Sequence, residues 1–248
     1  MRLSEIVEYL DTYLMVPHIP DSSLNGLQVE TDRDISKIAM AVDATLETFQ
    51  QAKEHKAELV IAHHGLFWDK APIRGPLYRR VRYLIENRIG LYAAHLPLDM
   101  HKEVGNNAEL AGILGMTNPV PFLRYKGSLI GLIGEIETMD IHEVVKLLEN
   151  RIGGDIRVFP MGNRKITKVA ICSGYGGPDL NQAIEKGADL YLTGETSHEA
   201  VALAEDAGIN IVFAGHYATE TLGPKALGKH IEATLGLPTV FISAPTGL

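Results

Sequence analysis

The stretch KIAMAVDATLETFQQAKEHKAELVIAHH, residues 37–64, indicates the class of fold. An apolar run at 37–43 is followed by helical spacing at 45–57 and by a second apolar run at 58–64. A strand, a helix and a strand in this order are typical of a parallel α/β unit. The second run ends in His63 and His64, so two imidazoles stand side by side where a buried strand stops.

The chain contains a second series of strands and helices that begins near residue 127 and resembles the first. In each copy a strand-end histidine is followed four residues later by a carboxylate. Two α/β units resemble each other in their apolar strands alone, but the matching histidine and carboxylate positions favour a true repeat. The matching segments are KIA at 37–39 and KVA at 168–170, AELVI at 57–61 and ADLYL at 188–192, and HLPLD at 95–99 and HYATE at 216–220.

The repeat predicts an α/β protein of two similar units with largely parallel sheets, related by a pseudo-two-fold, with a metal site between them. PVPFLRYKG, residues 119–127, is the best junction between the units. We therefore expect a first α/β unit over residues 1–124 and a second over residues 125–248.

Histidines and carboxylates gather at the ends of the predicted strands, where open α/β sheets collect ligands. Adjacent strand residues point to opposite faces, so His63 and His64 suit one metal only if the strand turns at Gly65. Alternatively, each imidazole takes one of two metals, and a carboxylate bridges them. A polar strand end that meets water is the simplest third interpretation. The candidate residues are His63, His64, His95, Asp99, Glu195, His216 and Glu220.

Composition and charge exclude several classes of protein. The 248 residues include 46% hydrophobic and 22% charged side chains, as in ordinary globular proteins. Lys+Arg 23 against Asp+Glu 31 gives a net charge of −8, which argues against strong nucleic-acid binding. The acidic N-terminal segment is unlike a secretory signal, no apolar run has the length of a membrane span, and Cys172 is the only cysteine. We therefore expect a cytoplasmic protein.

Common local motifs for metal or nucleotide chemistry are missing. No H-E-x-x-H, no pair of C-x-x-C motifs and no G-x-x-x-x-G-K-[ST] occurs in the chain. The glycine-rich CSGYGG, residues 172–177, is compatible with the approach of a phosphate to the backbone and equally with a plain tight turn.

Six motifs together resemble one family over essentially the whole chain. It is the Nif-three-like family of dinuclear metal-centre proteins, whose members are called type 2 homologues of GTP cyclohydrolase I. The chain resembles its short form. The motifs are NGLQV at 25–29, AHHGLFW at 62–68, HLPLD at 95–99, GNNAELA at 105–111, LTGE at 192–195 and GHYATE at 215–220.

The resemblance implies a toroidal homohexamer with a pair of metals in each subunit. It implies that His63 and Asp99 bind one metal, that His64 and His216 bind the second, and that Glu220 bridges both. His95 matches a family histidine close to the metals, and we expect His95 or Glu195 to move protons in catalysis. Imidazole and carboxylate ligands suit two divalent ions of Zn, Mn, Fe, Co or Ni.

Two functions follow from these expectations. The first is a metal-dependent hydrolase, with a purine nucleotide such as GTP as the substrate that the family name implies. The second is a non-catalytic hexameric scaffold or regulator with structural metals, which would bind single-stranded nucleic acid despite the acidic balance of the chain. Metal-dependent turnover supports the first, and salt-sensitive binding of DNA supports the second.

Overall fold

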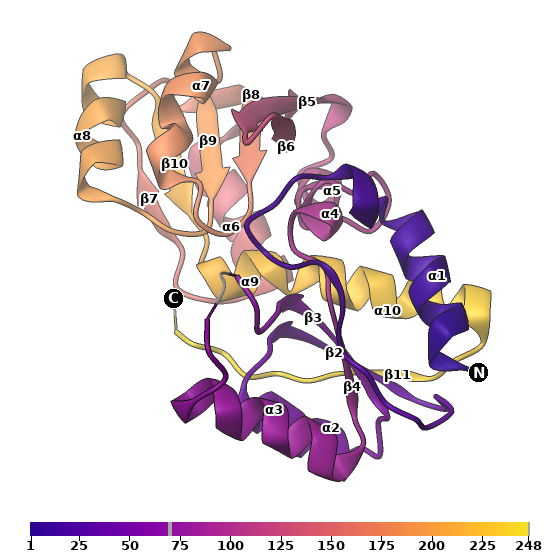
Figure 1. Ribbon diagram of the computed structural model, residues 1–248. Helices are drawn as coiled ribbons and strands as arrows, with labels where there is room; N and C mark the ends of the chain where they lie inside the picture. The colour runs from indigo at the N-terminus through magenta and orange to yellow at the C-terminus, as the bar shows by residue number, and fades with distance from the viewer. Residues whose placement is uncertain (69–70, 248) are drawn as a thin grey trace. The chain divides into compact units, whose positions relative to one another are not determined.

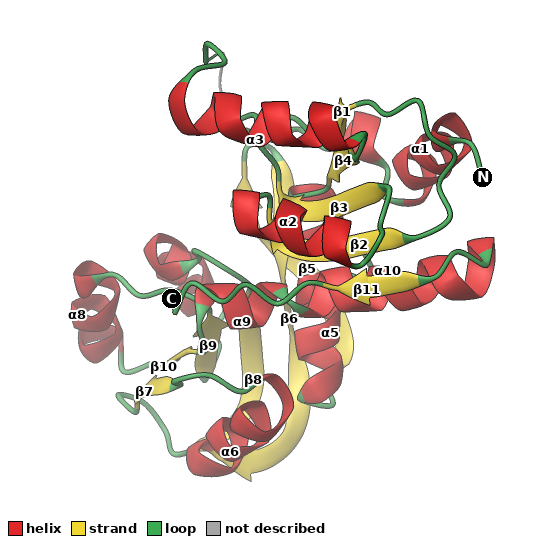
Figure 2. Ribbon diagram, turned by 90° about the horizontal axis from the view of Figure 1, so that it is seen from below, coloured by secondary structure: helices red, strands yellow, loops and turns green. Residues whose placement is uncertain are grey.

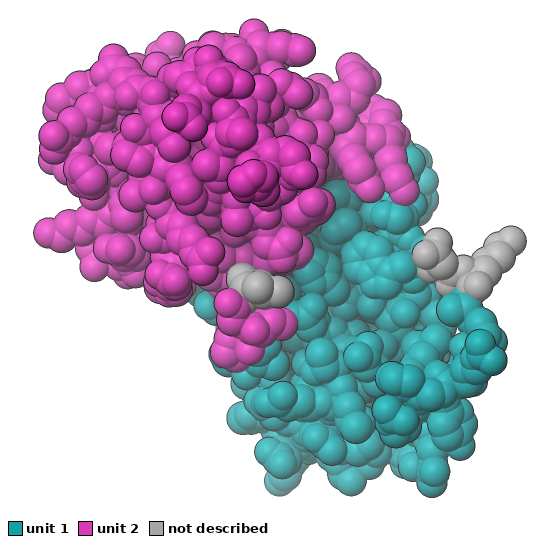
Figure 3. All heavy atoms as spheres, turned by 90° about the vertical axis from the view of Figure 1, so that its left-hand side faces the viewer, with its two compact units in different colours: residues 1–98, 223–244 teal, residues 99–222, 245–248 magenta. Residues whose placement is uncertain are grey.

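The structure, a computed structural model, describes residues 1–68 and 71–247 and contains two compact units (Figures 1 and 3). Unit 1 consists of residues 1–98 and 223–244, and unit 2 consists of residues 99–222 with the tail from Pro245. Each unit has its own sheet. Among the described helices, none is both long enough and apolar enough to cross a membrane.

The sheet of unit 1 is parallel except for the strand at one edge. That edge strand pairs antiparallel with its neighbour, and every other pairing in the sheet is parallel. Across the sheet the order is β1 (Gly26–Val29), β4 (Gly90–Ala93), β3 (Leu59–His64), β2 (Ile38–Asp43) and β11 (Thr239–Phe241).

Helices cover the sheet of unit 1 and explain its apolar strands. Helix α2 begins after Thr45, whose Oγ1 accepts a hydrogen bond from Thr48 N, and it packs with α3 against one face of the sheet (Figure 2). Because the strands are buried, β3 reads as the unbroken apolar run Leu59–Ala62. The helices of this part of the chain are α1 (Leu3–Tyr13), η1 (Val16–His18), α2 (Leu46–Glu54), α3 (Gly75–Asn87), α4 (Leu96–Asp99) and α10 (Leu222–Leu235).

The sheet of unit 2 has a parallel centre with antiparallel strands on both sides. Its order is β5 (Thr117–Tyr125), β6 (Ser128–Asp140), β8 (Lys165–Cys172), β9 (Leu190–Thr193), β10 (Asn210–Phe213) and β7 (Arg157–Phe159). Separate apolar clusters lie on its two faces. The helices are α5 (Asn106–Ile113), α6 (Ile141–Ile152), η2 (Gly177–Asp179), α7 (Leu180–Glu185), α8 (His198–Ala207) and α9 (His216–Glu220).

The topology of the two units confirms the predicted α/β class and the two similar units. The order β1-β4-β3-β2 in unit 1 has the same connections and directions as β7-β10-β9-β8 in unit 2. In both, three successive parallel strands are followed at the far edge by an antiparallel strand from earlier in the chain. The antiparallel β5 and β6 are an addition to unit 2 that the repeat did not predict.

The division between the units differs from the expected junction near residue 124. Residues 99–124 belong to unit 2, because β5 pairs along its length with β6. The chain then returns to unit 1 near its end, because β11 pairs in parallel with β2 at Thr239 and Ile38. A C-terminal strand of three residues carries too little periodicity for the sequence to place it.

Candidate metal centre

The two adjacent histidines lie at the last two positions of β3. His63 is fully buried, whereas the side chain of His64 retains 18% of its exposure. Their ring centroids are 4.7 Å apart, although regular strand geometry would point them to opposite faces. The end of the strand therefore brings both imidazoles to one place.

A fixed oxygen acceptor orients each of these imidazoles. His63 Nδ1 lies 3.0 Å from the carbonyl oxygen of Ala94, and His64 Nδ1 lies 2.9 Å from Oδ1 of Asp43. A carbonyl or carboxylate oxygen accepts a hydrogen bond from Nδ1–H, so each neutral ring keeps its lone pair on Nε2. This arrangement is typical of histidines that bind metals.

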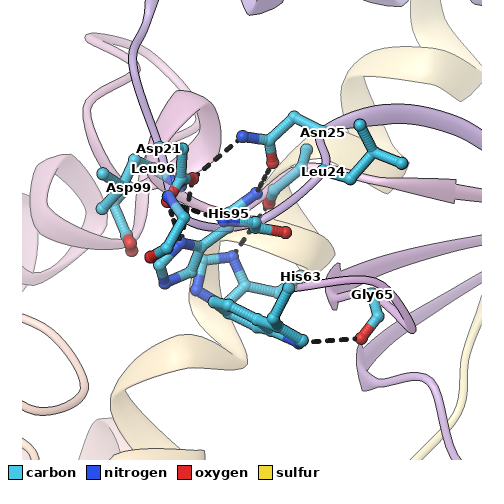
Figure 4. Close-up of polar contacts among 12 residues, drawn as sticks. Asp21, Leu24, Asn25, His63, Gly65, His95, Leu96 and Asp99 are labelled. Atoms are coloured by element: carbon cyan, nitrogen blue, oxygen red, sulfur yellow. Dashed lines mark hydrogen bonds and ion pairs between the residues drawn. The ribbon is translucent and has the colours of Figure 1, made fainter. Parts of the chain in front are cut away.

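His95 follows β4 and joins the same cluster. Its Nδ1 lies 2.9 Å from Oδ2 of Asp21, and its backbone N donates to Oδ1 of Asn25 at 2.8 Å (Figure 4). Burial opposes the charge on Asp21, but the His95 ring and the amide donors hold the pKa of Asp21 well below its ordinary value. One ligand nitrogen from each of His63, His64 and His95 lies within 4.8 Å of the others.

The NGLQV motif holds the loop that follows the two histidines. Leu66 N donates to Gln28 Oε1 at 2.7 Å, and Gln28 Nε2 donates to Leu24 O at 2.6 Å. Gly65 is required there, because an added Cβ would overlap the Gln28 amide. Residues 24–28 thus fix the position of the chain directly after His64.

In unit 2 the short helix α9 carries a histidine and a carboxylate one turn apart. His216 Nε2 lies 3.1 Å from Oε2 of Glu220, and His216 Nδ1 lies 3.0 Å from Oε1 of Glu195. Glu195, two residues after the end of β9, therefore orients His216 as Asp43 orients His64. This contact favours a positioning role for Glu195, whereas the sequence suggested proton transfer.

The CSGYGG segment lies directly against the carboxylate of Glu220. Gly174 has a φ of +62°, and an added Cβ would overlap Glu220 Oε1. Its N–H donates to Thr219 Oγ1 at 3.1 Å, and its carbonyl accepts from Glu195 N at 2.8 Å. The close approach of Glu220 therefore explains Gly174, and the two interpretations of the segment as a phosphate site or a tight turn stay predictions.

Asp99, at the end of α4, is nine-tenths buried within a polar network of unit 2. Its Oδ1 accepts from Ser173 Oγ and from Asn106 Nδ2, both at 2.9 Å, and its backbone carbonyl accepts from Asn107 Nδ2 at 3.2 Å. One carboxylate oxygen of Asp99 and one of Glu220 lie within 4.8 Å of each other. Unit 2 therefore gathers two buried carboxylates and, beside Glu195, one imidazole.

The donor sets of both units fit divalent metal ions of borderline softness. They combine imidazole Nε2 atoms, whose Nδ1 positions are held by oxygen acceptors, with buried carboxylates. The chain offers no thiolate here, because burial raises the pKa of the Cys172 thiol far above its ordinary value.

The sequence identified the ligand candidates but missed the residues that hold them. These supporting residues are Asp21, Asn25, Gln28, Asp43, Asn106, Ser173 and Thr219. Three of the motifs that carried the family resemblance, NGLQV, GNNAELA and GHYATE, contained four of them without a stated role. Asp43 at the end of the neighbouring strand was the clearest missed signal, because parallel strand ends lie side by side.

Fold and site together define a class: α/β proteins of two similar units whose strand ends and following turns carry histidine and carboxylate clusters suited to metals. The family model Duf34/NIF3 (NGG1p interacting factor 3) matches residues 1–246 of the chain. The chain belongs to this family.

Similar proteins match along their whole length. The chain is 43% identical to the "GTP cyclohydrolase 1 type 2 homolog" of Pyrococcus abyssi and 42% identical to that of Archaeoglobus fulgidus, with 100% of both chains covered in each case. The crystal structure of TTHA1606 from Thermus thermophilus superposes with a TM-score of 0.92 at 42% identity, again over 100% of both chains. These relatives extend the resemblance found in the motifs to the complete fold.

Proposed function

We propose that the ligands of the two units together hold two divalent metal ions and form the centre of a metal-dependent hydrolase. In this assignment His63 and Asp99 bind one ion, His64 and His216 bind the other, and Glu220 bridges both. The candidate ions are Zn, Mn, Fe, Co and Ni, because their divalent ions bind imidazole and carboxylate ligands. The fixed Nδ1 acceptor on every proposed histidine ligand is the observation that carries the proposal.

Bound divalent ions would supply Lewis acidity, which lowers the pKa of water and polarises an electrophilic carbon or phosphorus. His95 is the residue that moves the proton, because its Nδ1 is committed to Asp21 and its Nε2 can accept a proton. Glu195 keeps the His216 ring in orientation, and Ser173 and Asn106 do the same for the Asp99 carboxylate. A purine nucleotide is the proposed substrate, by analogy with the names of the relatives.

We also propose a cytoplasmic homohexamer, the assembly that the family resemblance implies. The alternative function is a scaffold or regulator in which the same ions are structural. The two functions differ in turnover by the metal-loaded protein, which can be measured.

The deciding experiment measures metal per chain by elemental mass spectrometry on protein purified without an affinity tag, followed by turnover assays with GTP. A stoichiometry near two with metal-dependent release of product supports the hydrolase. Two metals without turnover of GTP or other nucleotides leaves the scaffold as the function. A stoichiometry near zero that persists after incubation with Zn, Mn or Fe overturns the metal assignment itself.

A further inference from the structure

Trp68, the only tryptophan of the chain, lies on the loop after the two histidines of β3. Its side chain is 38% exposed, although an indole is among the largest apolar groups that a protein can bury. The indole Nε1 donates to the carbonyl oxygen of Gly65 at 3.1 Å. The polar atom is therefore used within the loop, and the ring is held in one orientation.

The ring of Trp68 lies against two imidazoles of unit 1. Its centroid is 4.9 Å from that of His95 in an edge-to-face arrangement and 5.8 Å from that of His64. Both imidazoles remain partly accessible, with side-chain exposures of 17% and 18%. An exposed aromatic surface thus adjoins the side chains that the proposed function uses.

A second exposed apolar side chain adjoins the same loop. Leu24 is 58% exposed, and its backbone N donates to Phe67 O at 2.8 Å. The Gln28 side chain links the segment of Leu24 to the loop after β3, because it accepts from Leu66 N and donates to Leu24 O. Trp68 and Leu24 therefore lie on two segments that hydrogen bonds hold together, and both side chains are exposed.

We propose that Trp68 is a stacking platform that binds the planar ring of a nucleobase beside His64 and His95. An immobilised indole loses little entropy when a flat heteroaromatic ring stacks on it, and such stacking tolerates any base because every base has a π-face. The inference rests on the proposed function for its reaction but concerns binding alone. The base would come from a free nucleotide or from a single strand of nucleic acid, and the two sources share this chemistry.

Because Trp68 is the only tryptophan, the intrinsic fluorescence of the protein reports directly on this site. Metal-loaded protein is titrated with guanosine monophosphate, with ribose 5-phosphate, which lacks the base, and with a short single-stranded oligonucleotide. We expect saturable quenching by guanosine monophosphate and no change with ribose 5-phosphate. Quenching by the oligonucleotide alone identifies a nucleic-acid strand as the source of the base. Absence of quenching by both base-containing probes overturns the proposal.

Substitution tests whether the ring itself binds. Trp68→Ala should weaken guanosine monophosphate binding in equilibrium dialysis about tenfold or more, and Trp68→Phe should recover part of the loss. Tyr78→Ala is the control. It removes an exposed aromatic side chain from α3 and should leave the affinity for guanosine monophosphate unchanged. Equal affinity in wild type and Trp68→Ala overturns the platform.

Metal content separates this inference from the proposed function. Trp68→Ala should retain the metal stoichiometry of the wild type, because Trp68 supplies no ligand atom. If the wild type holds no metal yet binds the base through Trp68, the hydrolase fails and the platform stands. If it holds metal and turns over a substrate with unchanged kcat and KM after Trp68→Ala, the platform fails and the hydrolase stands.

Discussion

In unit 1 the strand β3 ends in His63 and His64, whereas the corresponding strand β9 of unit 2 is followed by Gly194 and Glu195. In unit 1 the strand supplies the imidazole, and Asp43 at the end of the neighbouring strand orients it. In unit 2 the strand is followed by the orienting carboxylate, Glu195, and the imidazole comes from α9. The position that carries an imidazole at the end of β3 thus carries a carboxylate after β9, and the imidazole of unit 2 follows β10, the counterpart of β4.

Sterics explain why unit 2 has no side chain at the position that corresponds to His63. An added Cβ on Gly194 would lie 2.8 Å from the Cα of His216 and 2.7 Å from the carbonyl oxygen of Gly174. A side chain at this position would therefore displace α9. The comparison teaches that the two units gather candidate ligands at corresponding strand ends, while local packing decides which of these positions can carry a side chain.

Removal of the bridging candidate should have the largest effect. Glu220→Ala should lose both metals, because this assignment makes Glu220 a ligand of each ion. The fold should persist, since each unit keeps its own core. Elemental analysis with circular dichroism measures both properties, and a folded variant with full metal content would remove Glu220 from the bridging position.

Acidification should release metal through the imidazoles, most of which come from unit 1. Free imidazole is protonated below a pH of about 6.5, and a protonated ring cannot bind metal, so metal content should fall as the pH drops through this value. Asp21 has a lowered pKa, so its stabilising contribution is present above the ordinary carboxyl pKa and is lost only below a pH of about 4. Metal content measured after dialysis at decreasing pH should therefore fall near the imidazole pKa, before the contribution of Asp21 is lost. Full retention of metal at a pH of about 5 would contradict a histidine-dominated centre.

A steric change at unit 2 tests whether Glu220 must stay where it is. Gly174→Ala should weaken metal binding on the order of 10–100-fold, because the new methyl group overlaps Glu220 Oε1. Gly187→Ala is the matched control, since Gly187 has a φ of +64° and nothing within 4 Å of an added Cβ. Both variants carry the same backbone strain, so equal metal affinities would show that the overlap is relieved without moving the ligand.

Much of this architecture could be predicted from the chain alone. The apolar run before His63 and the helical spacing after Thr45 gave a strand and a helix, because parallel strands buried on both faces leave a continuous apolar pattern. The return of β11 to unit 1 and the addition of β5 to unit 2 depend on long-range pairing, which no local pattern encodes. The sequence did not identify the supporting residues for the same reason. Asp21, for example, contacts His95 although 74 positions separate them in the chain.

The orienting role of the carboxylate in each unit can be tested by neutralising it. Asp43→Asn and Glu195→Gln should each lower metal affinity roughly 10–100-fold, because both variants weaken the hold on Nδ1 of a ligand histidine. Asp32→Asn, which alters a surface carboxylate paired with Arg88, serves as the control. Competition with a chromophoric chelator measures the affinities. A large loss in one variant and none in the other would mean that the two carboxylates are not equivalent.

The smallest effect is expected at the serine that supports Asp99. Ser173→Ala removes one donor to Asp99 Oδ1 and keeps the donor from Asn106. A typical hydrogen bond contributes about 0.5–1.5 kcal/mol, so metal affinity should fall about 2–12-fold. Asn106→Ala together with Ser173→Ala should cost more than the sum of the single changes in free energy, because the buried carboxylate oxygen then loses both donors. Strictly additive losses in the chelator competition would show that the two donors act independently, and Asp99 would then be held in place by its backbone contact with Asn107.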